Sequence, residues 1–164
     1  MVRHMARAAL FAALMAVCAW ISIPVPPVRF TLQTLAILTA LGLLGGRWGC
    51  VSIGIYLLLG LAGLPVFSGF RGGIGALLDA TGGFLWGFGL GGLVFWLLER
   101  AGKWPAMIGF LLICYSCGTL WYLLYAPEAG LWAAITVMVL PYLLPEAAKL
   151  WLATVLVKKI QRNI

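Results

Sequence analysis

Six uncharged and mostly apolar runs, each 17 to 24 residues long, account for most of this chain. They cover residues 8–28, 30–46, 48–70, 80–98, 104–127 and 129–145. A helix needs about 20 apolar residues to cross a bilayer. Only 9% of the residues are charged, compared with about 25% in soluble domains, which excludes a water-soluble fold. The runs therefore predict an all-α integral membrane protein with six transmembrane helices joined by short loops.

Prolines define the last helix. Pro141 and Pro145 interrupt the sixth run, and a proline ends a helix that precedes it. We therefore expect a short segment at the membrane surface over 131–140, followed by the last transmembrane helix over 145–161. The other five predicted helices belong to the same single membrane domain of residues 1–164, and they cover residues 6–23, 31–45, 49–64, 81–99 and 105–125.

The basic residues predict the orientation. Six spans place both termini on one side, and the side richer in Lys and Arg is the cytoplasm. Cytoplasmic termini leave only Arg29 and Arg71 outside, with Lys149 inside the last helix. The remaining eight of the 11 basic residues then lie inside: Arg3, Arg7, Arg47, Arg100, Lys103, Lys158, Lys159 and Arg162. The net charge of +7 is explained by orientation, so we expect a multi-pass cell-membrane protein and no nucleic-acid partner.

The start of the chain allows two interpretations. Arg3 and Arg7 precede an apolar run, which is also the pattern of a signal peptide. Because the rest of the chain is membrane-embedded, we expect an uncleaved first helix.

Familiar catalytic and cofactor motifs are missing from the sequence. His4 is the only histidine, and the pair Cys114 and Cys117 falls within a predicted helix, where thiolates lack the access that redox or metal chemistry needs. Residues 87–92 match G-x-G-x-x-G, but no strand precedes them. There is no P-loop for ATP. We expect no enzymatic activity, no metal site and no cofactor of its own.

Glycine is concentrated between residues 60 and 92. Gly83, Gly87 and Gly91 recur every four residues, a spacing that lets a neighbouring helix approach closely. The segment 60–83 contains Arg71 and Asp79 among glycines that do not sustain a helix. It is either a plain outer connection or a loop that offers free backbone groups to a ligand.

Glu146 and Lys149 are ionisable residues at membrane depth, three positions apart and therefore on one helix face. Charges there usually meet a partner, a cavity or a substrate. One hypothesis is a mutual ion pair that neutralises both. The other is a carboxylate acceptor and an ammonium donor for a small polar solute, with Gln33 and Tyr115 as further candidates.

The first predicted helix has a surface of small residues. Ala9 and Ala13 are four residues apart, as are Ala8 and Ala12, so the helix can pack closely. From the residues alone, this surface faces either the bundle interior or another membrane protein.

Three segments resemble the BioY family, the biotin-specific S components of energy-coupling factor (ECF) vitamin transporters. They are GLAGLPVFSGFRGGIGALLDATGGFLWGF at 60–88, RFTLQTLAILTALGLLGGRWG at 29–49 and PYLLPEAAKLWLA at 141–153. The resemblance implies six helices, an outward-facing biotin site and a prokaryotic plasma membrane. It also implies a transmembrane T component and two cytosolic ATPases as partners. Those partners hydrolyse the ATP that drives import by toppling of the S component.

The resemblance also implies roles for single residues. Glu146 suits the ureido N–H groups of biotin, Lys149 suits the ureido oxygen or the tail, and Arg71 suits the carboxylate. The remaining implied biotin-binding residues are Gln33, Asp79, Thr81, Gly82, Gly83 and Tyr115, with Phe67, Phe84 and Trp86 burying the apolar body. Docking of the T component is implied at Ala9 and Ala13. The chain has Asp79-Ala80 where the family commonly has Gly-Pro, and Pro145-Glu146 where it usually has Gly-Asp.

Three alternatives to biotin capture remain open at this point. One is an S component for another small vitamin, such as a thiamine-type or riboflavin-type ligand. Another is a small membrane-embedded enzyme that acts on lipids, and the third is a purely structural membrane subunit.

Overall fold

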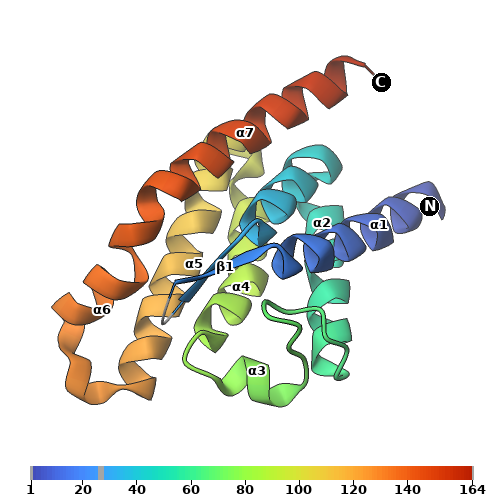
Figure 1. The fold of residues 1–164 in the computed structure, drawn as a ribbon. Coiled ribbons are helices and arrows are strands. Elements are labelled where there is room, and N and C mark those ends of the chain that lie inside the picture. The colour runs from blue at the N-terminus through green and yellow to red at the C-terminus, as the bar shows by residue number, and fades with distance from the viewer. Residues whose placement is uncertain (1, 26–27, 164) are drawn as a thin grey trace.

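The structure is a computed structural model that describes residues 2–25 and 28–163 (Figure 1). Five of its helices are long and apolar enough to cross a membrane, one of them being the joined stretch Gly130–Arg162. The described elements are α1 (Val2–Trp20), β1 (Ser22–Val25), β2 (Val28–Thr31), α2 (Gln33–Leu61), α3 (Ile74–Leu78), α4 (Gly82–Leu98), α5 (Lys103–Tyr125), α6 (Gly130–Met138) and α7 (Leu143–Arg162).

The break in α2 explains how five long helices correspond to six predicted spans. At Gly45 the backbone turns out of the helix, with φ 77° and ψ 169°, a conformation open to glycine. The two arms of α2 fold back on each other, and a Cβ at Gly49 would lie 2.7 Å from the Leu41 side chain. The Glu99 carboxylate accepts the N–H of Gly46 at 2.6 Å and so satisfies the start of the second arm. The arms correspond to the helices predicted over 31–45 and 49–64.

A short antiparallel hairpin adds to the all-α prediction. Strands β1 and β2 pair in the register Ser22↔Thr31 and Pro24↔Arg29, and they cross the front of the bundle in Figure 1. The first helix, predicted over residues 6–23, ends earlier, at Trp20. Pro24 cannot continue a helix, and the β-branched residues beside it favour extended backbone.

Helix α7 begins at Leu143, two residues before the predicted start at Pro145. Proline is tolerated in the first turn of a helix, where its missing N–H has no intrahelical partner to lose. Helix α6 precedes it, separated by the 3₁₀ turn Leu140–Tyr142, and the two follow one another along one side of the molecule (Figure 1). The placement of 131–140 at the membrane surface stays a prediction.

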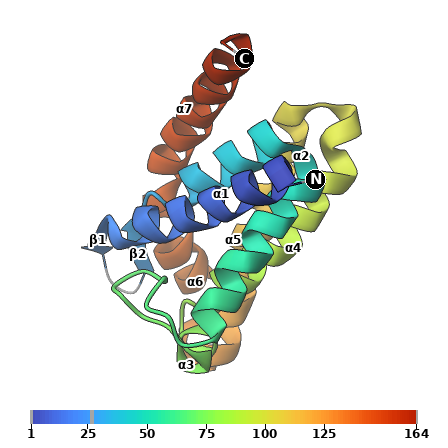
Figure 2. The same ribbon diagram turned by 90° about the vertical axis from the view of Figure 1, so that its right-hand side faces the viewer.

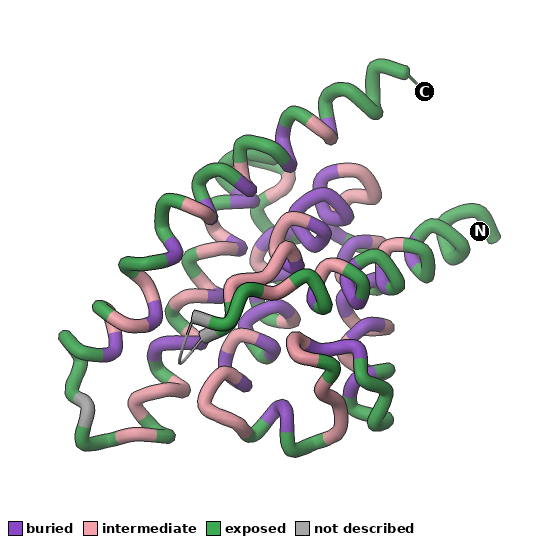
Figure 3. The backbone as a smooth tube through the Cα atoms, viewed as in Figure 1, coloured by how far each residue is buried: buried purple, intermediate pink, exposed green. Residues whose placement is uncertain are grey.

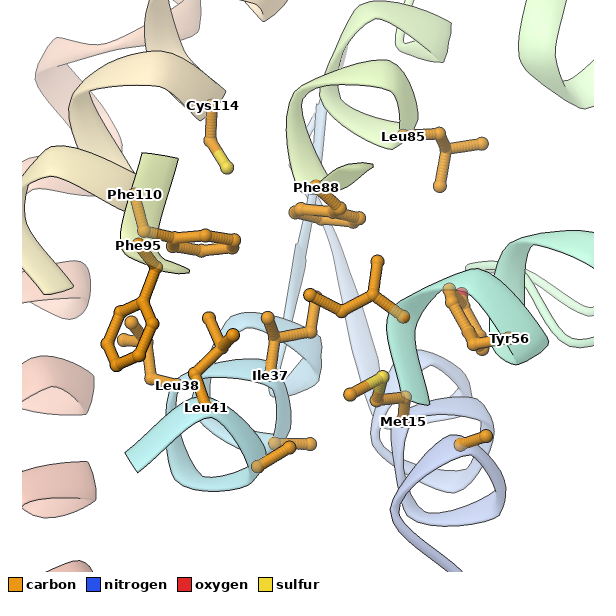
Figure 4. Packing of buried hydrophobic residues seen from close by; sticks show 14 of the residues in the cluster. Met15, Ile37, Leu38, Leu41, Tyr56, Leu85, Phe88, Phe95, Phe110 and Cys114 are labelled. Atoms are coloured by element: carbon orange, nitrogen blue, oxygen red, sulfur yellow. The ribbon is translucent and has the colours of Figure 1, made fainter. Parts of the chain in front are cut away.

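The core lies between α1, both arms of α2, α4 and α5 (Figure 4). Phe88 of α4 stacks on Phe110 of α5, with ring centroids 6.4 Å apart. The glycine spacing on α4 has the predicted effect, because a Cβ at Gly87 would lie 2.9 Å from the Cα of Cys114. Large apolar side chains such as Leu90 and Leu112 point outward, as expected where lipid is the solvent. Figure 3 shows the buried residues on the inner sides of the helices.

Both termini lie at the same end of the bundle, as an even number of spans requires (Figures 1 and 2). At that end the Gly42 carbonyl accepts hydrogen bonds from Lys103 of α5, at 2.9 Å, and Gln161 of α7, at 3.4 Å. His4 of α1 stacks on Trp48 just beyond the bend in α2. The hairpin and the loop that follows α2 lie away from this end and enclose the candidate site.

Candidate ligand-binding site

A cavity of about 310 Å³ lies between β2, the first arm of α2, the loop 62–81 and helices α4, α5 and α7. Its wall contains aromatic rings and the two ion pairs found among the described residues, Arg71–Asp79 and Lys149–Glu146. The lining residues are Arg29, Phe30, Thr31, Gln33, Thr34, Phe67, Ser68, Arg71, Ala76, Asp79, Ala80, Thr81, Phe84, Leu85, Phe88, Leu111, Cys114, Tyr115, Tyr142, Glu146 and Lys149.

Glu146 and Lys149 form a buried ion pair in this wall. Each residue is only 6% exposed, and Lys149 Nζ lies 2.6 Å from Glu146 Oε1. Thr34 joins the pair from α2: its hydroxyl donates to Glu146 Oε1 at 2.8 Å and accepts from Lys149 at 3.1 Å. The ring of Phe30 lies 4.2 Å from the ammonium group. The mutual ion pair is therefore present, and it also borders the cavity.

The second oxygen of the Glu146 carboxylate meets no hydrogen-bond donor in the described part of the chain. Glu146 Oε2 is buried and has no hydrogen-bond partner among the residues that the structure describes. A buried acceptor without a donor costs free energy. The arrangement thus leaves one strong acceptor available to an N–H group that a ligand brings.

Gln33 is held by a second polar chain. Its amide donates to the hydroxyl of Tyr56 at 2.7 Å, and Tyr56 donates to the Val66 carbonyl at 3.1 Å. Tyr56 is fully buried and meets Phe67 edge-on, with ring centroids 5.5 Å apart. Tyr56 thereby connects Gln33 in the cavity wall to the loop 62–81 through two hydrogen bonds.

Arg71 and Asp79 pair across the loop 62–81. Arg71 also donates to the Ser68 carbonyl at 3.3 Å and to the Thr81 hydroxyl at 3.4 Å. The hydrogen bond from Arg71 holds the pKa of the Asp79 carboxyl below its usual range, against the opposing effect of partial burial. Trp121 of α5 donates to the Asp79 carbonyl at 2.9 Å. The segment 60–83 is therefore an ordered wall of the cavity and not a plain connection.

The apolar wall differs from the prediction at one position. Phe67 and Phe84 line the cavity as expected, and Tyr115 meets Phe84 edge-on at 5.8 Å between centroids. Trp86 was wrongly included, since it is 47% exposed and does not line the cavity. Two residues after Phe84 on a helix, it points to a different face.

Of the nine predicted biotin-binding residues, seven line the cavity and two do not. Gly82 and Gly83 are buried at the start of α4, outside the lining set. A Cβ at Gly82 would collide with the Leu77 carbonyl, and one at Gly83 would lie 2.6 Å from the Cys117 carbonyl. They make room for backbone packing behind the site. The seven in the wall are Gln33, Arg71, Asp79, Thr81, Tyr115, Glu146 and Lys149.

Several lining residues were missed from the sequence. Thr34 on α2 and Phe30 on β2 carry no signal of their own, because their role comes from the approach of α7 to these two elements. Arg29 was recognised only as an outer charge. Cys114 was interpreted as a packing residue; it donates a hydrogen bond to the Gly87 carbonyl at 3.3 Å and also borders the cavity.

Within the described ranges 2–25 and 28–163, no group of three or more His, Cys, Asp or Glu side chains is placed to hold a metal ion. The alanines of α1 divide between two faces. Ala8 and Ala12 are buried in the bundle, whereas Ala9 and Ala13 are exposed. The small-residue surface therefore packs inside with one side and leaves the other uncovered.

The sequence profile described as "BioY family" matches residues 1–164. This chain belongs to the BioY family. The BioY-family protein named "Biotin transporter BioY" from Thermotoga maritima is 36% identical over 98% of this chain and 96% of its own length. The "Probable biotin transporter BioY" from Pyrococcus horikoshii is also 36% identical, over 94% of each chain.

The fold agrees with this family. A crystal structure described as the S-component for biotin from an ECF-type ABC transporter superposes with a TM-score of 0.89, covering 98% of this chain and 92% of the other, at 23% sequence identity. The BioY family is a family of transporters and not of enzymes, which removes the lipid-enzyme alternative. With its several membrane-spanning helices, the chain is a multi-pass protein of the prokaryotic plasma membrane.

Proposed function

We propose that this BioY-family chain is a biotin-binding S component, which captures biotin for an ECF-type uptake transporter. The observation that carries the proposal is the buried Glu146–Lys149 pair in the wall of a 310 Å³ cavity. A cavity of this size lies at the small end of the range for small-molecule sites. The relatives' names supply the ligand, and the chemistry of the wall supports it.

Biotin has a ureido ring with two N–H donors and a carbonyl acceptor. The unpaired Glu146 Oε2 accepts from a ureido N–H, and Lys149 donates to the ureido oxygen. Both contacts are charge-assisted and therefore strong. Thr34 keeps the carboxylate and the ammonium group in place from the facing helix. Gln33 and Tyr115 supply further polar edges in the same wall.

The remainder of biotin is an apolar ring and a chain that ends in a carboxylate. Phe67, Phe84 and Phe88 give the cavity an apolar wall suited to the sulfur-containing ring. The loop 62–81 places Arg71 and Thr81 in the same wall. A carboxylate at this loop meets positive charge and a hydroxyl donor.

The proposal includes partners. The exposed Ala9 and Ala13 on α1 allow another membrane helix to approach closely, and we assign this surface to a transmembrane T component. ATP hydrolysis belongs to two cytosolic ATPase subunits. The chain itself then needs no cofactor.

Binding of radiolabelled biotin to the purified protein tests the ligand. Saturable binding at submicromolar concentration, unaffected by excess thiamine or riboflavin, is the expected result. Saturable binding of radiolabelled thiamine or riboflavin, without saturable binding of biotin, would assign the site to another ligand. No saturable binding at submicromolar concentration would contradict the proposal.

A further inference from the structure

Arg29 places a second guanidinium group at the cavity wall. It lies on β2, where it pairs with Pro24, and it lines the cavity. Its side chain reaches across to the loop 62–81 and lies directly against Gly69, where an added Cβ would collide with the guanidinium group. Arg29 and Arg71 thus both border the cavity at this loop, one from the hairpin and one from the loop itself.

The two arginines differ in what already neutralises them. Arg71 is paired with Asp79 and donates to two further oxygens. The Glu146 carboxylate is paired with Lys149. For Arg29, the described residues provide neither an acidic partner nor a side-chain hydrogen bond. Among the charged residues that line the cavity, the positive charge of Arg29 is the one left without a counter-charge.

We propose that Arg29 is the specificity-determining residue that makes the site prefer a ligand with a negatively charged tail. This inference rests on the proposed biotin-capture function and deepens it. A carboxylate beside Arg29 gains a charge-assisted hydrogen bond from its guanidinium group and neutralises the unpaired charge. Arg71 also borders the cavity, but its charge is already paired with Asp79, so the carboxylate gains more from Arg29.

The contact is partly open to solvent, because Arg29 is exposed. Its contribution is therefore smaller than that of a buried pair and is screened by salt. We expect the wild-type protein to prefer biotin over biotinamide, in which a neutral amide replaces the carboxylate. The part of this preference that Arg29 contributes is about two- to fivefold at low ionic strength.

Dissociation constants for biotin and biotinamide, measured on the full chain, test this assignment. Arg29→Gln should weaken biotin binding about two- to fivefold and leave biotinamide binding unchanged, which also shows that the variant is folded. Arg29→Lys should retain part of the preference. The matched control is Arg100→Gln, at the other end of the bundle, which should keep the wild-type preference. High salt should reduce the preference of the wild type and not that of Arg29→Gln.

Other results would overturn the inference. An unchanged preference in Arg29→Gln would assign the charged tail elsewhere. Equal weakening of both ligands would make Arg29 a structural residue. If the wild type bound biotinamide as tightly as biotin, there would be no charge selection to explain, although biotin capture would stand. Binding of neither ligand by the wild type would contradict the proposed function itself, and the inference with it.

Discussion

Gln33 and Tyr56 lie on opposite arms of the same folded helix, and the Gln33 amide donates a 2.7 Å hydrogen bond to the Tyr56 hydroxyl. Tyr56 passes the connection on to the Val66 carbonyl in the loop that covers the cavity. The bend at Gly45 therefore brings together a cavity residue, a buried tyrosine and the loop. This relation gives Tyr56 a positioning role for a site that it does not line.

Replacement of Tyr56 by Phe tests that role. The variant keeps the ring against Phe67 but leaves the Val66 carbonyl without its donor, which costs about 1–3 kcal/mol of stability. We also expect weaker biotin binding, measured as a dissociation constant. Because Tyr56 acts through Gln33, the effects of Tyr56→Phe and Gln33→Ala should be non-additive in a double-mutant cycle. The control is Tyr122→Phe, on α5 outside the cavity lining. Full additivity, or an equal effect of this control, would contradict the positioning role.

Removal of Lys149 should abolish biotin binding. Lys149→Ala takes away a donor and leaves the 6% exposed Glu146 charge without its partner, a change that costs several kcal/mol. We expect a loss of more than 100-fold in affinity by equilibrium binding. Cys117→Ala is the control, since Cys117 does not line the cavity. An equal loss in both variants would show that the site is misplaced.

Asp79 should give the loop 62–81 a stability that depends on pH. The Arg71 hydrogen bond lowers the pKa of Asp79 in the folded state, so its stabilisation is fully present above the unfolded pKa of about 3.9. It disappears as the pH falls through the folded pKa. Protease cleavage within the loop, followed from pH 7 downward, should accelerate below pH ~4 in the wild type. In Asp79→Asn it should already be fast at pH 7, and similar profiles for both would contradict the assignment.

Two glycine substitutions should have opposite effects, because Gly83 lies where α4 approaches α5 closely and Gly54 lies at an open position on α2. Gly83→Ala would force a methyl group to 2.6 Å from the Cys117 carbonyl, and such overpacking costs about 1–3 kcal/mol. Gly54→Ala meets no atom within 4 Å and should raise stability by about 1 kcal/mol through helix propensity. Thermal unfolding in detergent measures both. If Gly83→Ala melted at the same temperature as Gly54→Ala, α4 and α5 would be able to move apart to accept the methyl group.

A bulky residue on the uncovered face of α1 should block assembly and spare ligand capture. Ala13→Trp projects from the surface assigned to the T component, so co-purification with an ECF module should fall at least tenfold. Biotin binding by the isolated chain should not change. Leu90→Trp, at an exposed position on α4, is the control. Normal assembly of Ala13→Trp would move the docking surface elsewhere.

The sequence alone was enough for the features that follow from local composition. Uncharged runs predicted the spans, and the sparse charges predicted which ends lie together, because lipid excludes charge wherever a helix crosses it. Glu146 and Lys149 were identifiable as a site for the same reason, since ionisable groups at membrane depth need a partner. The G-x-x-x-G spacing on α4 predicted close helix packing, because it depends only on side-chain size.

The tertiary structure alone decided which residues share the cavity wall. Thr34 reaches Glu146 and Lys149 across 112 and 115 residues of sequence, and Tyr56 joins Gln33 to Val66 only because α2 folds back at Gly45. Gly82 and Gly83, which were predicted to bind ligand, lie outside the cavity lining and pack against backbone. Among the described residues, the charge of Arg29 has no partner because Asp79 pairs with Arg71 instead. Such choices between equally available partners depend on distance in space, which local composition does not determine.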